Sequence, residues 1–427
     1  MKIKLILLLL LLACFRINIS EAQSNLQSDT LKITLAEAEK MFLNQNLLLL
    51  AEKCNVEAAK AQIIQAKLFS NPNISIEQGV YDPDTKRVFD IDYSRNTGFT
   101  IQQLFYLAGK RNKRIKLEQI NTQKQEYLLF DLMRTLKLQL RNDFNTLYYQ
   151  LQTLKVYEKE INSLKTLITV FEVQNKNGFV SDKELIRLKA SIFSLENDKL
   201  NITSTIFKLQ TELGSLIRKP NAYIIPQLNE SNNNLVNIQS IDIKAITETA
   251  LQNRSDLKAA EQDFKWNQTN LSYQKALGVP DFTLMGSYSK QGSYVRNYNA
   301  ITLAIDLPFF NRNQGNIKAA KFQTDNSKYI LQNTEEDVKA DVLQAYKKIS
   351  ENESVYKTIN ASFNTDFDKL LDEITKNYEK KNISLLEFID FYDAYKENTN
   401  QMNSFLSNRL NSFEELNYSV GKNIINY

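Results

Sequence analysis

Apolar residues recur at intervals of three and four between residues 129 and 168, which is the spacing of one face of an α-helix. Ten of them form one line with steps of 4, 3, 4, 4, 3, 4, 3, 7 and 7: Leu129, Met133, Leu136, Leu140, Phe144, Leu147, Leu151, Leu154, Ile161 and Ile168. This line predicts a coiled-coil seam with one four-residue stutter, which locally unwinds the supercoil. A second line, Tyr157, Leu164 and Phe171, lies on another face, so we expect the helix to pack on neighbours at both sides.

Two stretches of the chain have almost no Gly and no Pro to interrupt a helix. They run from Ala108 to Lys176 and from Gln314 to Glu379. At about 1.5 Å per residue each would form a rod of roughly 100 Å, which no compact globular domain contains. The sequence therefore predicts long antiparallel coiled-coil helices, arranged either as the wall of a helical cylinder or as a plain antiparallel bundle.

Two short segments of alternating polar and apolar residues precede each long helix. The four predicted strands are 73–80, 97–105, 281–289 and 300–307. Their alternation is typical of a membrane β-barrel strand, and equally of a half-buried hairpin in a soluble protein. Four strands cannot close a barrel, and an open sheet edge cannot face lipid. A membrane location would therefore require several chains to share one barrel.

Matched turns follow the two long helices. Ser181 with Glu184, and Ser384 with Glu387, have the spacing of capping boxes, so a returning helix is expected to begin at each serine. Gly178 and Asn382 suit the left-handed conformation that ends a helix. Apolar residues, Phe179 and its counterpart Ile383, stand in the turns and would serve either as hydrophobic staples or as an exposed docking surface.

The second half of the chain repeats the first at an offset of 208 residues. Residues 35–76 align without a gap onto residues 243–284, and the register resumes in the long helices and the turns. The fold class is therefore mainly α with a small β part, built from a duplicated unit of helix, β-hairpin, long helix and returning helix. We place the first repeat at 23–220, an Asn-rich connecting segment at 221–240 and the second repeat at 241–427.

Residues 1–22 have the features of an export signal. Lys2 and Lys4 precede a short apolar run, and Ser20-Glu21-Ala22 is a small-residue cleavage site. Cys14 is the candidate lipidation site, since Leu11-Leu12-Ala13-Cys14 resembles a lipobox; we favour simple cleavage after Ala22. The remaining cysteine, Cys54, is expected to be a small buried residue on a helix.

Composition argues against catalysis. The 427 residues include no His, which removes catalytic triads, histidine zinc sites and histidine proton relays. The sequence also has no phosphate-binding loop and no nucleophile elbow. We therefore expect a protein that is not an enzyme and that uses neither a cofactor nor a bound metal, and the net charge of +4 assigns no partner.

This order of elements, twice over, resembles the outer-membrane efflux protein (TolC) family across nearly all of the chain beyond the signal. Its most specific motifs are the strand-to-helix junctions at 103–111 and 307–317, together with the tip segments 178–188 and 382–395. The second junction, Leu307-Pro308-Phe309-Phe310-Asn311-Arg312-Asn313-Gln314-Gly315-Asn316-Ile317, is most like members that serve cobalt-zinc-cadmium efflux systems.

The resemblance implies a homotrimer in the outer membrane of a Gram-negative-type cell. Three protomers would give four strands each to a twelve-stranded transmembrane barrel, which a trimeric helical barrel continues into the periplasm. A periplasmic adaptor and an inner-membrane pump, with the resistance-nodulation-division type favoured, would complete a tripartite system. The outer component would be a passive gated duct in contact with lipid, and no nucleic acid is implied.

The resemblance also assigns site residues. The tips that would contact the adaptor are Gly178, Phe179, Val180, Ser181, Asn382, Ile383 and Ser384. Glu387 and Asp390 would form two anionic rings at the pore constriction, although capping alone would explain Glu387. The first tip has Glu184 and Arg187 instead, for which we expect a local ion pair.

The transported substrate stays open among metal ions, drugs and polypeptides. A type I secretion duct is the nearest functional alternative. A periplasmic coiled-coil scaffold without a pore is the alternative from a different class.

Overall fold

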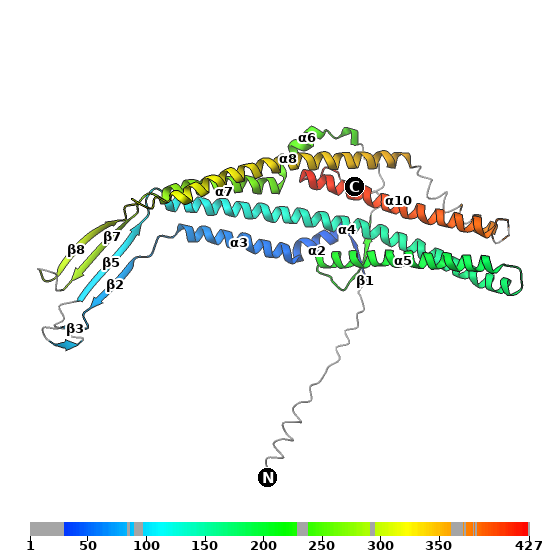
Figure 1. Cartoon of the computed structure of the whole chain (residues 1–427), viewed down its shortest axis with the longest axis horizontal. Coiled ribbons are helices and arrows are strands. Elements are labelled where there is room, and N and C mark those ends of the chain that lie inside the picture. The colour runs from blue at the N-terminus through cyan, green and yellow to red at the C-terminus, as the bar shows by residue number, and fades with distance from the viewer. Residues whose placement is uncertain are drawn as a thin grey trace, which may run out of the picture.

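The computed structural model describes residues 30–82, 86–88, 97–228, 238–290, 295–359, 370, 373–378, 380 and 382–425. The molecule is a long rod with a β-sheet at one end (Figure 1). At the other end lie two tips, each of which is a turn between two helices. The signal segment 1–22 with Cys14, and residues 229–237 of the connecting segment, lie outside the described residues.

Ten elements are described up to residue 228, and the last of them, β6, lies in the predicted connecting segment. They are β1 (Thr30–Thr34), α2 (Leu35–Gln45), α3 (Leu47–Lys67), β2 (Asn73–Gln78), β3 (Tyr81–Asp82), β4 (Arg87–Val88), β5 (Thr97–Phe105), α4 (Lys110–Lys176), α5 (Asp182–Leu216) and β6 (Tyr223–Gln227). The predicted strands at 73–80 and 97–105 are confirmed as β2 and β5. The first predicted rod is confirmed as α4, whose 67 residues correspond to about 100 Å of helix.

The second repeat has the same order. It contains η2 (Ile238–Ser240), α6 (Ile243–Asn253), α7 (Ser255–Leu277), β7 (Phe282–Ser289), β8 (Tyr298–Ile305), α8 (Gln314–Thr358) and α10 (Leu385–Val420). The predicted strands at 281–289 and 300–307 are confirmed as β7 and β8. The second predicted rod is too long, because α8 ends at Thr358 and Ile359 is its extended C-cap residue, whereas the prediction continued the helix to Glu379.

The helix break is the most exact match between the repeats. Asn46 separates α2 from α3, and Arg254, at the offset of 208, separates α6 from α7; both residues are extended and 4% exposed. The Asn46 Oδ1 accepts hydrogen bonds from the amides of Leu48 and Leu49 at 3.0 and 3.1 Å. The Arg254 side chain instead forms ion pairs with two carboxylates, those of Asp256 and Asp341.

Buried residues of α4 contribute to two separate hydrophobic cores. Leu136, Leu140, Phe144 and Leu147 are buried with α2, α3, α5 and β6 in the first repeat. Nearer the tip the buried side chains include the second line, Tyr157, Leu164 and Phe171, which packs with α5 and α10. The expected packing of α4 on neighbours at both sides is confirmed.

Strands from both repeats form one antiparallel sheet in the order β2-β5-β7-β8. The two predicted hairpins meet along β5 and β7, with Ile101 opposite Gly286 and Phe105 opposite Phe282. The rings of Phe105 and Phe282 stack with centroids 5.1 Å apart. The sheet therefore fuses the two halves at the end of the rod opposite the tips.

The sequence did not predict the parallel pair of β1 and β6. Leu31 lies opposite Ile224, and this short pair ties the start of the first repeat to its end. The expectation for Cys54 is wrong: the residue lies on α3 and is exposed, since α3 buries its Val56 and Ala59 face against the rest of the repeat.

Candidate functional site

The four-stranded sheet is sharply two-faced. Residues opposite one another in an antiparallel ladder project to the same side, and the register groups one set of apolar residues across all four strands: Ile74, Ile76, Phe99, Ile101, Phe105, Phe282, Leu284, Tyr288, Ile301, Leu303 and Ile305. The other side carries mostly small and polar residues, among them Ser75, Thr100, Gln102, Ser287 and Thr302.

The apolar face is open. Ile76 is 73% exposed, Ile301 is 84% exposed and Leu303 is 59% exposed. None of the described helices covers this sheet, which projects from the end of the rod (Figure 1). A half-buried soluble hairpin would place such residues against a core, so the exposure disfavours that alternative. An apolar patch of this extent is typical of a surface that contacts lipid or another protein.

Both edges of the sheet are also open. Within the described part of the chain, β2 pairs only with β5, and β8 pairs only with β7. Their outer backbone amides and carbonyls are therefore available for pairing with further strands.

At the other end of the rod the two tips lie next to each other. Both capping boxes are confirmed: the Ser181 amide donates to Glu184 Oε2 at 3.0 Å, and the Ser384 amide donates to Glu387 Oε2 at 2.8 Å. The Glu184 and Glu387 amides donate back to the serine Oγ atoms, both at 3.3 Å. Gly178 has φ of +76°, as predicted.

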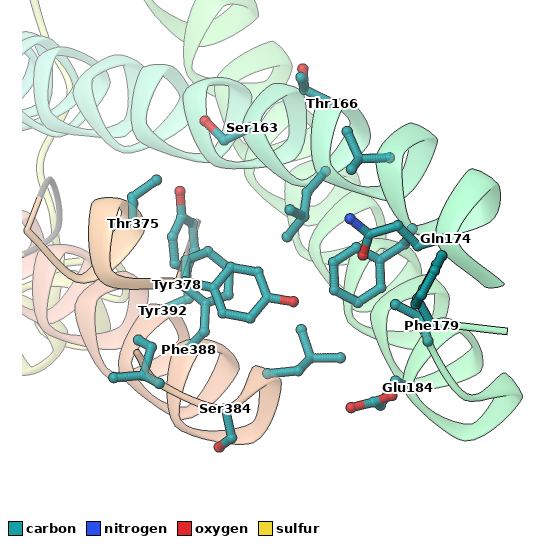
Figure 2. Close-up of a pocket in the computed structure, with 16 residues that line it drawn as sticks. Ser163, Thr166, Gln174, Phe179, Glu184, Thr375, Tyr378, Ser384, Phe388 and Tyr392 are labelled. Carbon is teal, nitrogen blue, oxygen red and sulfur yellow. The ribbon is translucent and has the colours of Figure 1, made fainter. Parts of the chain in front are cut away.

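A cavity of about 590 Å³ lies between the tips (Figure 2). It is lined from the first repeat by Phe171, Phe179 and Val180, and from the second by Ile383, Ser384 and a set of aromatic rings. Tyr378 stacks on Phe171 and on Phe388 with centroid distances of 6.0 and 4.5 Å, and Phe388 contacts Tyr392 at 4.9 Å. The structure thus brings both predicted tips to one aromatic pocket.

The tip residues differ in exposure. Val180 and Ile383 are half-buried in the tip core, where they act as staples for α5 and α10. Phe179 is 77% exposed, so stapling does not account for it. Of the two interpretations of Phe179, the exposed apolar surface is the one that its geometry favours.

Glu387 and Asp390 both lie on the exposed side of α10, whose buried side carries Phe388 and Ile389. The Ser384 backbone amide and then the Ser384 hydroxyl donate to the Glu387 carboxylate and lower its pKa. Asp390 makes no hydrogen bond or ion pair with any described residue, so no contact in this part of the chain accounts for its charge.

The expected ion pair between Glu184 and Arg187 is wrong. The Glu184 carboxylate is occupied by the Ser181 amide and hydroxyl, whose hydrogen bonds lower its pKa. Arg187 stays exposed. Capping geometry holds Glu184 at the start of α5, away from a side chain one turn later.

Sequence analysis missed a buried carboxylate above the tips. Glu160 of α4 is 1% exposed, and among the described residues neither of its oxygens has a hydrogen-bond partner. Burial raises its pKa to about 8, while Lys396 acts in the opposite direction. The signal was present, because Glu160 lies three residues after Tyr157 and four before Leu164 on the buried side of α4.

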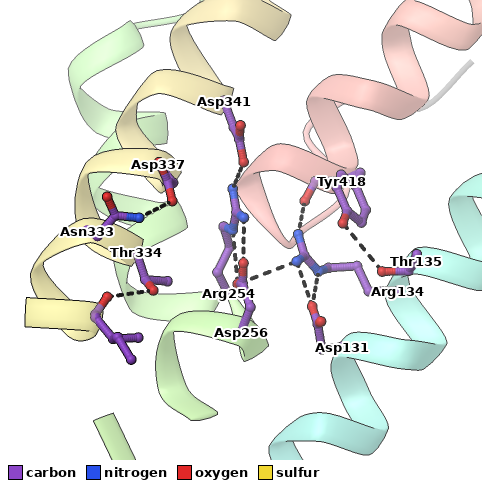
Figure 3. Close-up of polar contacts among 11 residues, drawn as sticks. Asp131, Arg134, Thr135, Arg254, Asp256, Asn333, Thr334, Asp337, Asp341 and Tyr418 are labelled. Atoms are coloured by element: carbon purple, nitrogen blue, oxygen red, sulfur yellow. Dashed lines mark hydrogen bonds and ion pairs between the residues drawn. The ribbon is translucent and has the colours of Figure 1, made fainter. Parts of the chain in front are cut away.

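An ionic cluster at mid-rod joins both repeats (Figure 3). Arg254 binds Asp256 of α7 and Asp341 of α8 at 2.5 and 2.7 Å, and Asp256 lies 3.4 Å from Arg134 of α4. Arg134 donates to the carbonyl of Tyr418 on α10 at 2.7 Å. Burial opposes the charge of Arg254, but the hydrogen bonds to Asp256 and Asp341 outweigh it and raise its pKa.

Across the described ranges, no cluster of three His, Cys, Asp or Glu side chains is suited to hold a metal ion. A membrane-crossing helix would need a length and apolar character that none of the described helices combines.

Comparison with known proteins identifies the family. Residues 246–362, from α6 through α8, match the model of the family described as outer membrane efflux protein. This segment of the chain matches the outer membrane efflux protein family. Its members are efflux channels of the outer membrane, so the protein is a transport component of that membrane and not an enzyme.

Individual relatives agree over most of the chain. The cobalt-zinc-cadmium resistance protein CzcC of Cupriavidus metallidurans is 19% identical over 358 residues, which cover 84% of this chain and 82% of CzcC. A membrane protein from Pseudomonas aeruginosa has a similar fold, with a TM-score of 0.74, 15% identity and coverage of 91% and 92% of the two chains. The Campylobacter jejuni CmeC outer membrane channel matches with a TM-score of 0.74 and 16% identity over 92% of this chain and 87% of its own.

Proposed function

We propose that this protein is the outer-membrane channel of a tripartite efflux system, a passive gated duct formed by three copies of the chain. The observation that carries the proposal is the two-faced sheet, which is apolar on one side, open at both edges and continuous with a helix of 67 residues. Such a sheet is stable in a membrane only when its edges are paired, which further copies of the same sheet would accomplish.

The order of the helices supports a ring. In one protomer α4 packs between α3 and α7 near the sheet and between α5 and α10 near the tips, and α8 packs on α7 and α10. The outer edges of the protomer are therefore α3 with α5 on one side and α8 on the other. Contact between these two different edges would be head-to-tail, and repeated contact of that kind gives a ring when the rotation between copies closes.

One edge carries an unpaired coiled-coil stripe. Exposed apolar residues occur on α5 at a strict spacing of seven: Ile186, Phe193, Leu200 and Phe207, which are 66%, 77%, 68% and 60% exposed. This spacing is that of a seam between two helices. The stripe supports a neighbouring helix from the next protomer.

The opposite edge has a matching apolar character. On α8, Phe322, Tyr329, Ile330, Leu343 and Val355 are 43 to 69% exposed. Near the sheet α3 offers Leu47 and Ile64, both more than half exposed. Apolar residues on both edges favour an interface of α8 with α3 and α5 of the neighbouring copy.

The sheet fits the same arrangement. The β2 edge lies on the α3 side and the β8 edge on the α8 side, so a head-to-tail ring would pair β8 of one copy with β2 of the next. Three copies of four strands make a barrel of twelve, with the apolar face toward lipid. A periplasmic scaffold without a pore would have no use for this face.

The tips are proposed to dock a periplasmic adaptor, itself attached to an inner-membrane pump of the resistance-nodulation-division type. Phe179 and the aromatic pocket beside it offer an apolar surface at the far end of the rod. Gly178, Val180, Ser181, Asn382, Ile383 and Ser384 would complete that surface. Glu387 and Asp390 would line the constriction as anionic rings that attract cations.

Divalent metal ions are the substrate class that we favour. The support is the likeness to CzcC, named a cobalt-zinc-cadmium resistance protein, and the junction motif at 307–317. The metal would pass through the duct as cargo.

Cell fractionation with a heat-modifiable gel shift tests the channel. A membrane-barrel trimer should run in the outer-membrane fraction as a compact species until it is heated, whereas a scaffold would run as a soluble monomer or bundle. Deletion of the chain, followed by growth on graded cobalt, zinc, cadmium and drugs, tests the cargo. A deletion strain that is sensitive to the metals but not to the drugs would support divalent metal ions as the substrate. A strain that loses polypeptide secretion but is sensitive to neither metals nor drugs would favour the type I secretion alternative.

A further inference from the structure

The strands and helices of this protein are joined by four crossings that we call the junction collar: residues 67–72, 104–117, 275–282 and 305–321. The collar lies where the sheet meets the helical rod (Figure 1). It has an unusual surface, both aromatic and basic, for which channel formation alone gives no reason.

Each crossing exposes apolar side chains. Phe69 is 72% exposed, Tyr106 46%, Val279 40% and Phe310 94%. These residues lie just beyond the ends of the strands. Aromatic residues in such a position are typical of the boundary between a bilayer core and water.

The collar is also the most basic part of the chain. It holds ten Lys or Arg and two Asp, a formal charge of +8, whereas the whole chain carries +4. The remainder of the protein is therefore net acidic. Basic residues gathered at a membrane boundary attract anionic lipid.

Internal contacts neutralise one of the two acidic residues. Asp281 binds the buried Lys110 at 2.7 Å and accepts from the Leu107 amide at 2.8 Å. Arg111 is held in place without a carboxylate: its Nε donates to the Lys67 carbonyl at 3.0 Å, and its guanidinium lies 4.0 Å from the centre of the Phe69 ring. Lys113 donates to the Ala108 carbonyl at 2.7 Å.

The outer cations of the collar remain uncompensated. Arg114, Lys116, Arg312, Lys318 and Lys321 are exposed, and none forms an ion pair with a described residue. A cation whose side chain is fixed by carbonyls and an aromatic ring, such as Arg111, is pre-organised for a phosphate oxygen.

We propose that the junction collar binds the phosphate groups of anionic phospholipids in the leaflet that borders the helical rod. The inference rests on the proposed channel, since it requires the sheet to lie in a bilayer. Arg111, Arg114, Lys116 and Arg312 hold the phosphates, while Phe69, Tyr106 and Phe310 lie among the upper acyl chains. Bound lipid then seals the boundary between barrel and rod.

Lipid retention measured by native mass spectrometry tests the collar. The full-length protein is extracted from bilayers that contain equal amounts of phosphatidylglycerol and phosphatidylcholine. We expect the wild type to retain phosphatidylglycerol preferentially. Each basic residue near an anionic surface contributes about a fivefold gain in affinity, so Arg114→Glu with Lys116→Glu and Arg312→Glu should weaken retention by roughly a hundredfold.

The matched control removes the same charge elsewhere. Lys183→Glu with Lys339→Glu and Lys347→Glu changes three exposed lysines of α5 and α8 outside the collar, and retention should stay at the wild-type level. If the glutamate triple fails to assemble, the corresponding glutamine triple carries the test with the same expected direction.

Three results would overturn the proposal. They are equal retention of both lipids by the wild type, equal loss in the control triple, and displacement of the lipid by inorganic phosphate alone, which would mark a free-phosphate site. Heat-modifiable gel mobility distinguishes failure of the lipid-binding proposal from failure of the proposed channel. A protein that keeps its heat-modifiable mobility but shows no lipid preference would refute only lipid binding at the junction collar.

Discussion

Lys396 of α10 lies 3.3 Å from the Asp198 carboxylate of α5, so this ion pair connects the returning helices of the two repeats. The same ammonium lies 3.7 Å from Asp393. Any movement of α10 away from the first repeat must break this link, and the link lies between the aromatic tips and the mid-rod core.

The first prediction concerns this ion pair. Lys396→Ala should raise the ratio of open to closed channels by up to about fivefold, since partly exposed pairs contribute up to about 1 kcal/mol. Single-channel recording in bilayers gives the ratio. Exchange of the charges, Asp198→Lys with Lys396→Asp, should restore the wild-type ratio. An unchanged ratio in Lys396→Ala would show that this ion pair does not stabilise the closed channel.

Glu160 predicts a pH dependence of stability. Its pKa is about 8 in the folded protein, against a usual value of 4.5, because burial disfavours the charged form. The folded state binds this proton more tightly than the unfolded chain, so the free energy of unfolding should fall as pH rises from about 4.5 to about 8. Asp143, whose pKa burial raises to about 7, should act in the same direction.

Glu160→Gln should therefore flatten the pH profile. At pH 8 we expect a gain on the order of 2 kcal/mol, seen as a higher Tm of the detergent-solubilised protein, and little change at pH 5. Glu351→Gln, an exposed acid of α8, is the matched control and should leave the profile unaltered. Equal slopes for wild type and Glu160→Gln would contradict the assignment.

The α5 stripe predicts the strength of the ring. Phe193→Lys should destabilise the assembly by about 1.5 to 3 kcal/mol per interface, because a charge replaces an aromatic ring that the proposed interface would bury. Native mass spectrometry should detect monomer, and the heat-modifiable band should disappear at a lower temperature. Ser194→Lys adds the same charge next to the stripe and should leave the ring intact; equal disruption by both changes would argue against the seam.

The two acidic residues of the second tip should separate by role. Asp390→Asn should reduce cation block of the single-channel current without a change in Tm, since this side chain has no partner among the described residues. Glu387→Ala should in addition lower stability by about 0.5 to 2 kcal/mol through loss of the cap. Unchanged conductance and block in Asp390→Asn would remove the constriction assignment and leave the fold untouched.

Phe179 predicts the adaptor contact. Phe179→Asp should abolish efflux while the gel shift of the trimer stays normal, because the side chain is 77% exposed and supports no core. Asn177→Asp adds a charge to the same turn without removing an apolar group, and should retain most of the activity. Loss of the trimer in Phe179→Asp would instead assign the residue a structural role.

Periodicity predicted what depends on local repetition. The line from Leu129 to Ile168, the capping boxes at Ser181 and Ser384, and the strand pairs all follow from spacing along the chain, and the structure confirms them. The seven-residue stripe on α5 and the buried position of Glu160 had the same kind of signal but were overlooked.

Contacts between segments that are distant in the sequence produce no periodic pattern from which they could be predicted. The β1 pair with β6, the Arg254 cluster and the buried ion pair of Glu353 with Arg409 join residues with no shared period. The early end of α8 at Thr358 was also invisible, because no Gly or Pro marks it. Glu184 and Arg187 show the converse, since suitable spacing did not produce a contact once the capping serine had taken the carboxylate.

The open edges of β2 and β8 have a consequence for biogenesis. A solitary copy has no favourable place in the cell: water meets its apolar sheet and stripe, and lipid meets its unpaired backbone. For the proposed ring, folding, association and insertion would therefore proceed together, and copies made faster than they find partners would become aggregates or substrates for proteases. The supply of the proposed channel would then be limited by the association of its copies as much as by their synthesis.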